Sequence, residues 1–81
     1  MVHSLKSLRQ SLLEMRWSAG LTQQELAERS GLSIRTISDI ERGQVICPRA
    51  ATLRLLARAL EMSDDQTREL MLMARSPVYL M

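Results

Sequence analysis

Residues 22–43 read TQQELAERSGLSIRTISDIERG and contain two short helical patterns separated by a glycine. Thr22 stands three residues before Glu25, which is the spacing of a capping box. In that motif the Thr hydroxyl accepts from the third helical residue, and the Glu side chain reaches back to the cap. Gly31 can take the left-handed conformation that ends a helix and turns the chain sharply. The pattern therefore predicts a helix of about two turns that stops at this glycine.

A second short helix is expected directly after the turn. Ser33 can cap it, and isoleucines at helical spacing continue to Gly43, which gives a helix over about residues 33–42. Ala27 is small enough to let the two helices cross closely. The expected shared core consists of Leu26, Leu32, Ile37 and Ile40. The positions left on the outer side of the second helix are Ser33, Ile34, Arg35, Thr36, Ser38, Asp39 and Arg42. This arrangement is a helix-turn-helix, whose second helix can enter the major groove of DNA.

The flanking sequence predicts three more helices. An apolar stripe precedes the turn region and consists of Leu5, Leu8, Leu12 and Met15. It indicates a helix that ends near Gly20. Pro48 favours a helix start near Arg49, and the pattern of that helix runs to Leu60. Residues 63–66 repeat the capping-box spacing and open a last helix to about residue 75. The chain is therefore expected to be all-α with five helices.

Composition narrows the classes of function. The chain has 81 residues, and this length excludes most enzymes and a second folded domain. Its formal net charge is +2. The charge is unevenly distributed. Residues 29–58 hold six arginines against Asp39 and Glu41, whereas residues 59–75 hold four acidic residues against two arginines. This segregation indicates one surface that binds an anion.

Other chemistry is not expected. Cys47 is the single cysteine and His3 the single histidine, so neither has a companion for catalysis or for a metal site. We expect no catalytic residues, no metal and no cofactor. No apolar run has the length of a signal peptide or of a membrane span, so we expect a cytoplasmic, nucleoid-associated location without a membrane partner.

Residues 23–43 resemble the helix-turn-helix of the lambda-repressor and Cro-like family, often called XRE. The resemblance extends through LLEMRWSAGLTQ before this segment and CPRAATLRLLARALEMS after it, so it covers about residues 8 to 63. It implies a five-helix, lambda-repressor-like DNA-binding domain with its helix-turn-helix in helices 2 and 3. We expect this domain over residues 1–75, with residues 76–81 as a tail. Family members are mostly bacterial, phage or plasmid transcriptional regulators that bind operators as dimers.

The resemblance also implies roles for individual residues. Gln23 matches a glutamine that holds a phosphate, and its alternative role is that of an exposed helix residue. Ile34, Arg35 and Asp39 occupy base-reading positions, where Arg35 could fork onto guanine for about 1–3 kcal/mol of discrimination. Arg49 matches an arginine that approaches the minor groove, unless it is a solvated loop arginine.

The remaining implied positions are less specific. Ser33, Thr36 and Ser38 are candidates for short-range contacts to phosphates or bases, although exposed hydroxyls on helices usually have no specific role. Arg42 suits the negative end of the helix dipole and could also contact the DNA backbone. Arg16 and Glu41 match a family pair that joins the first helix to the end of the third, and that would orient the arginine toward a phosphate. We interpret this pair as mainly structural.

Some features depart from the family pattern. Residues 45–47 are Val-Ile-Cys where relatives often have basic residues, and Asp39 would repel phosphates unless it pairs with Arg35 or accepts from a cytosine amino group. Trp17 and Leu13 could form an exposed patch, or Trp17 could be partly buried under the chain termini. A homodimer is expected, and its candidate contact surfaces are the last helix and the apolar tail of Val78, Tyr79, Leu80 and Met81. The alternative function is a protein-interaction module that uses the Leu13/Trp17 patch or this tail.

Overall fold

The computed structural model describes residues 7–44 and 48–75, and all secondary structure in these ranges is helical. The helices are α1 (Leu8–Ser18), α2 (Gln23–Ser30), α3 (Ile34–Glu41), α4 (Ala50–Ala59) and α5 (Asp64–Arg75). The predicted all-α class with five helices is confirmed. The predicted tail, residues 45–47 and the start of the apolar stripe at Leu5 lie outside the described residues.

Local caps set the helix boundaries that the sequence predicts. At the start of α2 the Thr22 hydroxyl accepts from the amide of Glu25 at 3.0 Å, and the Glu25 carboxylate accepts from the amide of Thr22 at 2.8 Å. Both halves of the capping box are therefore present. Gly31 ends α2 with a φ of 78°, which is the left-handed region that a side chain disfavours. Ser63 caps α5 in the same reciprocal way with Gln66.

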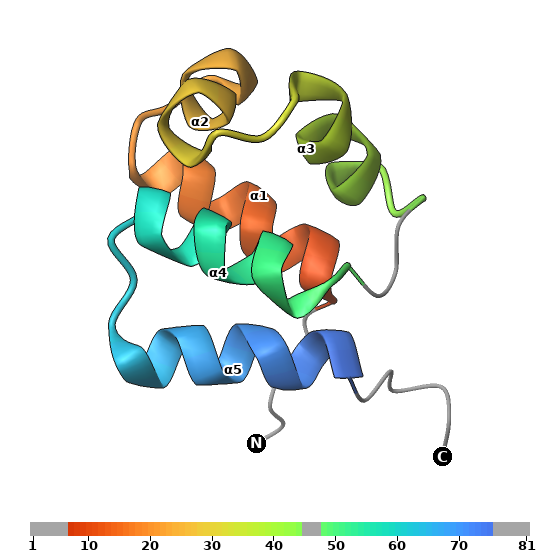
Figure 1. Cartoon of the computed structure of the whole chain (residues 1–81), viewed down its shortest axis with the longest axis vertical. Helices are drawn as coiled ribbons and strands as arrows, with labels where there is room; N and C mark the ends of the chain where they lie inside the picture. Colours follow the sequence, from red (N-terminus) through yellow and green to blue (C-terminus); the bar gives the residue numbers. More distant parts are fainter. Residues whose placement is uncertain (1–6, 45–47, 76–81) are drawn as a thin grey trace.

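The helices are arranged along the long axis of the molecule (Figure 1). α2 and α3 occupy one end, α5 lies across the opposite end, and α1 and α4 lie between them. α3 packs on α1 and α2, whereas α5 packs on α1 and α4. The helix-turn-helix is thus held at one end of the domain, away from the last helix.

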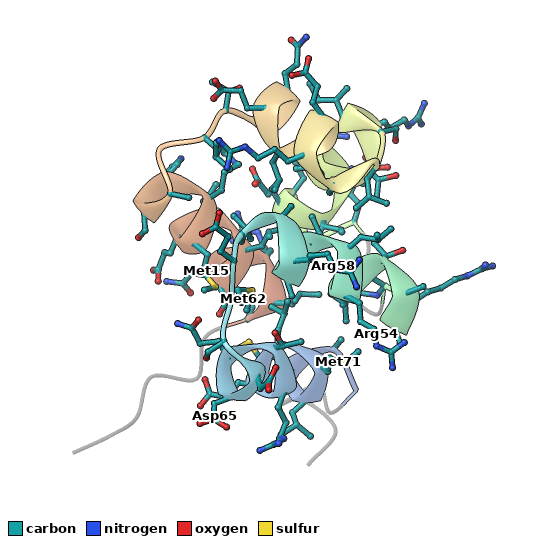
Figure 2. The ribbon with its side chains drawn as sticks, turned by 60° about the vertical axis from the view of Figure 1, so that its left-hand side comes forward. Met15, Arg54, Arg58, Met62, Asp65 and Met71 are labelled. Atoms are coloured by element: carbon teal, nitrogen blue, oxygen red, sulfur yellow. The ribbon has the colours of Figure 1, made fainter. Side chains whose placement is uncertain are left out.

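A single apolar core joins all five helices. Its buried members are Leu8, Leu12, Leu21, Leu26, Ala27, Ile37, Ile40, Leu53, Leu56, Leu70 and Ala74. Leu32 and several methionines pack around it partly buried. Met15 and Met62 line the same surface groove between α1 and α5 (Figure 2).

The residues that the structure describes lack both a helix suited to cross a membrane and a group of side chains suited to bind a metal. None of these helices combines the length and the apolar character that crossing a membrane requires. Within the same residues, no group of three or more His, Cys, Asp and Glu side chains is placed to hold a metal ion.

Candidate nucleic-acid interface

α3 has one buried face and one open face. Ile37 and Ile40 point into the core and are essentially inaccessible to solvent. On the opposite side Ile34 is exposed, and the side chain of Arg35 is 87% exposed. The inner isoleucines therefore fix the helix to the domain, and its first turn is left free for a ligand.

The start of α3 is organised by two hydroxyl groups. Ser33 accepts a hydrogen bond from the amide of Thr36 at 3.0 Å, and its Oγ also lies 2.9 Å from Thr36 Oγ1. Ser33 is exposed, whereas Thr36 and Ser38 are half-buried. The cap thus holds Ser33 and Thr36 next to Ile34 and Arg35 at the end of the helix that could approach base edges.

Asp39 lies between two arginines of the same helix. Its Oδ1 is 2.7 Å from Nη2 of Arg42, and its Oδ2 is 3.8 Å from Nε of Arg35. The ion pair between Arg35 and Asp39, which the four-residue spacing suggests, is therefore present as a loose contact. The closer partner is Arg42, which sequence reasoning did not assign to Asp39.

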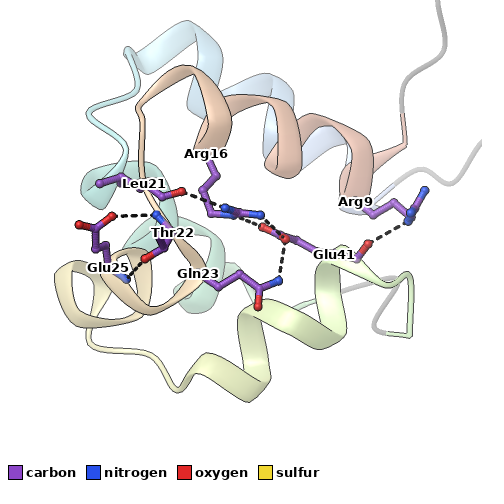
Figure 3. Close-up of polar contacts among 7 residues, drawn as sticks. All are labelled: Arg9, Arg16, Leu21, Thr22, Gln23, Glu25 and Glu41. Atoms are coloured by element: carbon purple, nitrogen blue, oxygen red, sulfur yellow. Dashed lines mark hydrogen bonds and ion pairs between the residues drawn. The ribbon is translucent and has the colours of Figure 1, made fainter.

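A buried polar cluster connects α1, α2 and α3, and its centre is Glu41 (Figure 3). The Glu41 carboxylate accepts from Arg16 Nε at 2.7 Å and from Arg16 Nη2 at 2.9 Å, which is a forked pair. Gln23 donates from Nε2 to the same carboxylate at 2.9 Å. Arg16 also donates from Nη1 to the carbonyl of Leu21 at 2.9 Å.

The contacts in this cluster turn the side chains of Arg16 and Gln23 toward the protein interior. Arg16 is only 9% exposed, so its guanidinium lies inside the protein and is not turned outward toward a phosphate. Gln23 is half-buried, and one of its amide hydrogens points inward to Glu41. Because an amide nitrogen has two hydrogens, Gln23 retains one donor for an outside partner.

The charge state of Arg16 follows from the same contacts. The hydrogen bonds that Arg16 donates to Glu41 raise the pKa of Arg16 above the ordinary arginine value. Burial of the guanidinium lowers this pKa, and the negative charge of Glu41 adds to the increase. Arg16 therefore remains charged wherever the protein is folded.

Sequence reasoning missed one member of the cluster. Arg9 donates from Nε to the backbone carbonyl of Glu41 at 3.0 Å and so holds the end of α3 to α1 (Figure 3). Arg9 and Arg16 are seven residues apart, which places them on one face of α1. This spacing could have indicated that Arg9 lies on the same side of α1 as Arg16, but it does not show which backbone carbonyl Arg9 contacts.

Further arginines of the basic segment lie outside α3 and are exposed. Arg49 is exposed at the start of α4, where its side chain makes no capping hydrogen bond. Arg54 and Arg58 lie on the outer side of α4 (Figure 2). Arg29 is exposed at the end of α2. The arginines of the basic segment are thus all at the surface of the described chain.

The possible apolar patch on α1 is only partly formed. Trp17 is 63% exposed, and Leu13 one turn before it is half-buried. Trp17 is therefore a mostly exposed aromatic side chain next to the turn that leads into α2.

The comparison with protein families agrees with this geometry. A family described as helix-turn-helix matches residues 12–66, which include α2 and α3 entirely and reach from α1 into α5. Neither the curated proteins nor the solved structures gave a match. The family consists of DNA-binding domains, usually of transcription regulators, and is not a family of enzymes. The matched residues and the five-helix fold show that this chain belongs to the lambda-repressor and Cro-like (XRE-type) helix-turn-helix family.

Proposed function

We propose that this protein binds specific sequences in double-stranded DNA and regulates transcription. In this proposal α3 enters the major groove with its first turn at the base edges. Arg35 and Ile34 read bases, Gln23 and Arg42 contact the backbone, and Arg49 approaches from the start of α4. Ser33, Thr36 and Ser38 supply short-range contacts around them.

The observation that carries the proposal is the division of α3 into two faces. Its inner isoleucines are fully buried against α1 and α2, while Arg35 on the outer side is almost fully exposed at the N-terminal end. A rigidly held helix with an exposed arginine at its leading end is what direct readout of guanine requires, because the guanidinium must reach O6 and N7 together.

Operator binding by one domain would be weak, so the proposal includes a homodimer. Two copies of α3 must reach successive major grooves about 34 Å apart. α5 lies at the end of the molecule opposite α2, and its exposed Leu72 offers apolar surface for a second copy. The dimer and a location in a bacterial cytoplasm are parts of the proposal that follow from the family resemblance.

The test is a fluorescence-anisotropy titration of the purified protein onto a labelled mixed-sequence duplex at several salt concentrations. The Arg35→Ala variant should bind with lower affinity and with a salt slope shallower by about 0.9 if its contact on this duplex is to a phosphate. On a duplex selected by the wild-type protein, the loss should be about 1–3 kcal/mol at the guanine that Arg35 contacts.

Arg68→Ala is the matched control, because Arg68 is also an exposed arginine paired to an aspartate but lies on α5. It should leave DNA affinity unchanged. If the wild-type protein binds no duplex even at low salt, or if the two variants lose affinity equally, the proposed DNA surface is wrong.

A second candidate function is supported by Trp17, a large aromatic side chain that is 63% exposed. In that case the domain binds a protein partner through the Trp17 surface. Trp17→Ala in the same titration separates the two candidates. A DNA-binding domain should retain its affinity in this variant, whereas Arg35→Ala should lose it.

A further inference from the structure

Asp39 places a negative charge on the helix that is proposed to approach a polyanion. Its carboxylate is 2.7 Å from Arg42 and 3.8 Å from Arg35, and its side chain is 21% exposed. Arg35 and Arg42 are far more exposed than the carboxylate between them. The acidic group therefore sits among the side chains that would meet the DNA.

The two ion pairs differ in strength. At 2.7 Å the contact with Arg42 is a charge-assisted hydrogen bond, whereas 3.8 Å between Arg35 and Asp39 is too long for a hydrogen bond. A loose, exposed ion pair stabilises little, so Arg35 can leave Asp39 for a base at small cost. Arg42 makes the shorter contact, so it must give up its hydrogen bond to Asp39 before it can contact a phosphate.

DNA can satisfy the Asp39 carboxylate only at particular bases. Phosphate oxygens are negative and repel it, whereas the amino groups of cytosine N4 and adenine N6 are donors in the major groove. Arg35 and Asp39 are four residues apart and share one face of α3. One helical turn is about 5.4 Å, so a guanine met by Arg35 and an amino group met by Asp39 lie one or two base pairs apart.

We propose that Asp39 is a specificity-determining residue that weakens binding to DNA lacking this pair of partners. On a non-cognate duplex, the Asp39 carboxylate keeps its hydrogen bond to Arg42 and repels the phosphates. On a cognate duplex, a base amino group donates a hydrogen bond to this carboxylate. The inference rests on the proposed DNA-binding function and extends it to the way in which wrong sequences are rejected.

The experiment compares the wild-type protein with Asp39→Asn, which keeps the size of the side chain and removes its charge. Each protein is titrated onto a duplex that the wild-type protein selects from a random library, and onto a scrambled duplex of the same length. Affinity for the scrambled duplex should rise by about three- to tenfold, with a salt slope steeper by about 0.9 as one arginine is released to a phosphate. Affinity for the selected duplex should change by less than about twofold, because the lost donor contact offsets the lost repulsion.

Asp65→Asn is the matched control. Asp65 also forms an exposed pair with an arginine three residues later, at 3.5 Å, but it lies on α5 at the opposite end of the molecule. This variant removes the same charge and should leave both affinities unchanged. A general effect of net charge would instead appear in both variants.

A second substitution at the same position keeps the test valid if Asp39→Asn fails to fold. Asp39→Ser removes the charge with a smaller side chain, and circular dichroism verifies that each variant is folded. The inference is overturned if the folded Asp39 variants bind the scrambled duplex no better than the wild type, or if they lose affinity only for the selected duplex. Failure of the wild-type protein to bind any duplex would instead refute the proposed function itself.

Discussion

At the scale of single residues, Glu41 accepts hydrogen bonds from three side chains of other helices. Its carboxylate accepts from Arg16 and Gln23, and its backbone carbonyl accepts from Arg9. These donors come from α1 and α2, so one residue at the end of α3 ties three helices together. The orientation of α3 relative to the core, and with it the surface that is proposed to meet DNA, therefore depends in part on this residue.

Glu41→Ala should therefore lower the free energy of unfolding by about 3–5 kcal/mol, because it leaves the Arg16 charge buried without its partner. Urea denaturation followed by circular dichroism measures this. The pKa of Arg16 is raised, so its contribution is complete below the ordinary arginine pKa and is lost only as the pH rises through the folded value. The loss of stability should thus be the same at pH 6 and pH 8.

Asp65→Ala is the control for this substitution, because it breaks an exposed ion pair with Arg68. Its effect should stay within about 0.5 kcal/mol. A loss below about 1 kcal/mol in Glu41→Ala would show that solvent satisfies Arg16, and that the cluster does not hold the helices.

At the scale of elements, the turn between α2 and α3 sets their crossing. Gly31 has a φ of 78°, and a Cβ built on it would meet nothing within 4 Å. The cost of a side chain is therefore the backbone conformation alone, without a steric clash.

Gly31→Ala should destabilise the protein by about 1–2 kcal/mol, which is the penalty for a left-handed residue. Gly31→Asn should cost less, since asparagine tolerates this region. Thermal unfolding of both variants beside the wild type measures the difference. Equal stability of all three proteins would mean that the turn has another conformation in solution.

Contacts within single helices explain which parts of the structure could be predicted from the sequence. The capping hydrogen bonds at the starts of α2 and α5 join residues that are three positions apart, Thr22 with Glu25 and Ser63 with Gln66. This spacing alone predicts where the two helices start. The pair of Arg35 and Asp39 is local in the same way. Local contacts depend only on helix geometry, and they were therefore accessible before the fold was known.

Contacts between distant residues were less accessible. Gln23 and Glu41 are 18 residues apart, and Arg9 lies 32 residues from the carbonyl that it contacts. Those distances depend on how α1 and α2 cross α3, which periodicity does not specify. The family resemblance suggested Arg16 with Glu41, but the inward turn of Gln23 and the role of Arg9 came only from the structure.

At the scale of the whole molecule, the helix-turn-helix and α5 lie at opposite ends and share one core through α1 and α4 (Figure 1). Leu70 is 2% exposed and inserts into this core, whereas Leu72 on the same helix is 51% exposed. A single core predicts that loss of packing under α5 lowers the stability of α2 and α3 as well, because small domains unfold as one unit.

Leu70→Ala should reduce the free energy of unfolding by about 2–5 kcal/mol, and Leu72→Ala should change it by less than about 0.5 kcal/mol. At a temperature where both are folded, each monomeric domain should bind a half-site duplex as the wild type does, since both leucines belong to α5, which lies at the end of the molecule opposite α2 and α3. On heating Leu70→Ala, DNA binding and helical signal should fall together at a lower temperature. If the helical signal were instead lost in two steps, with DNA binding retained after the first, α5 would be an independent unit and the helix-turn-helix would be stable on α1 to α4 alone.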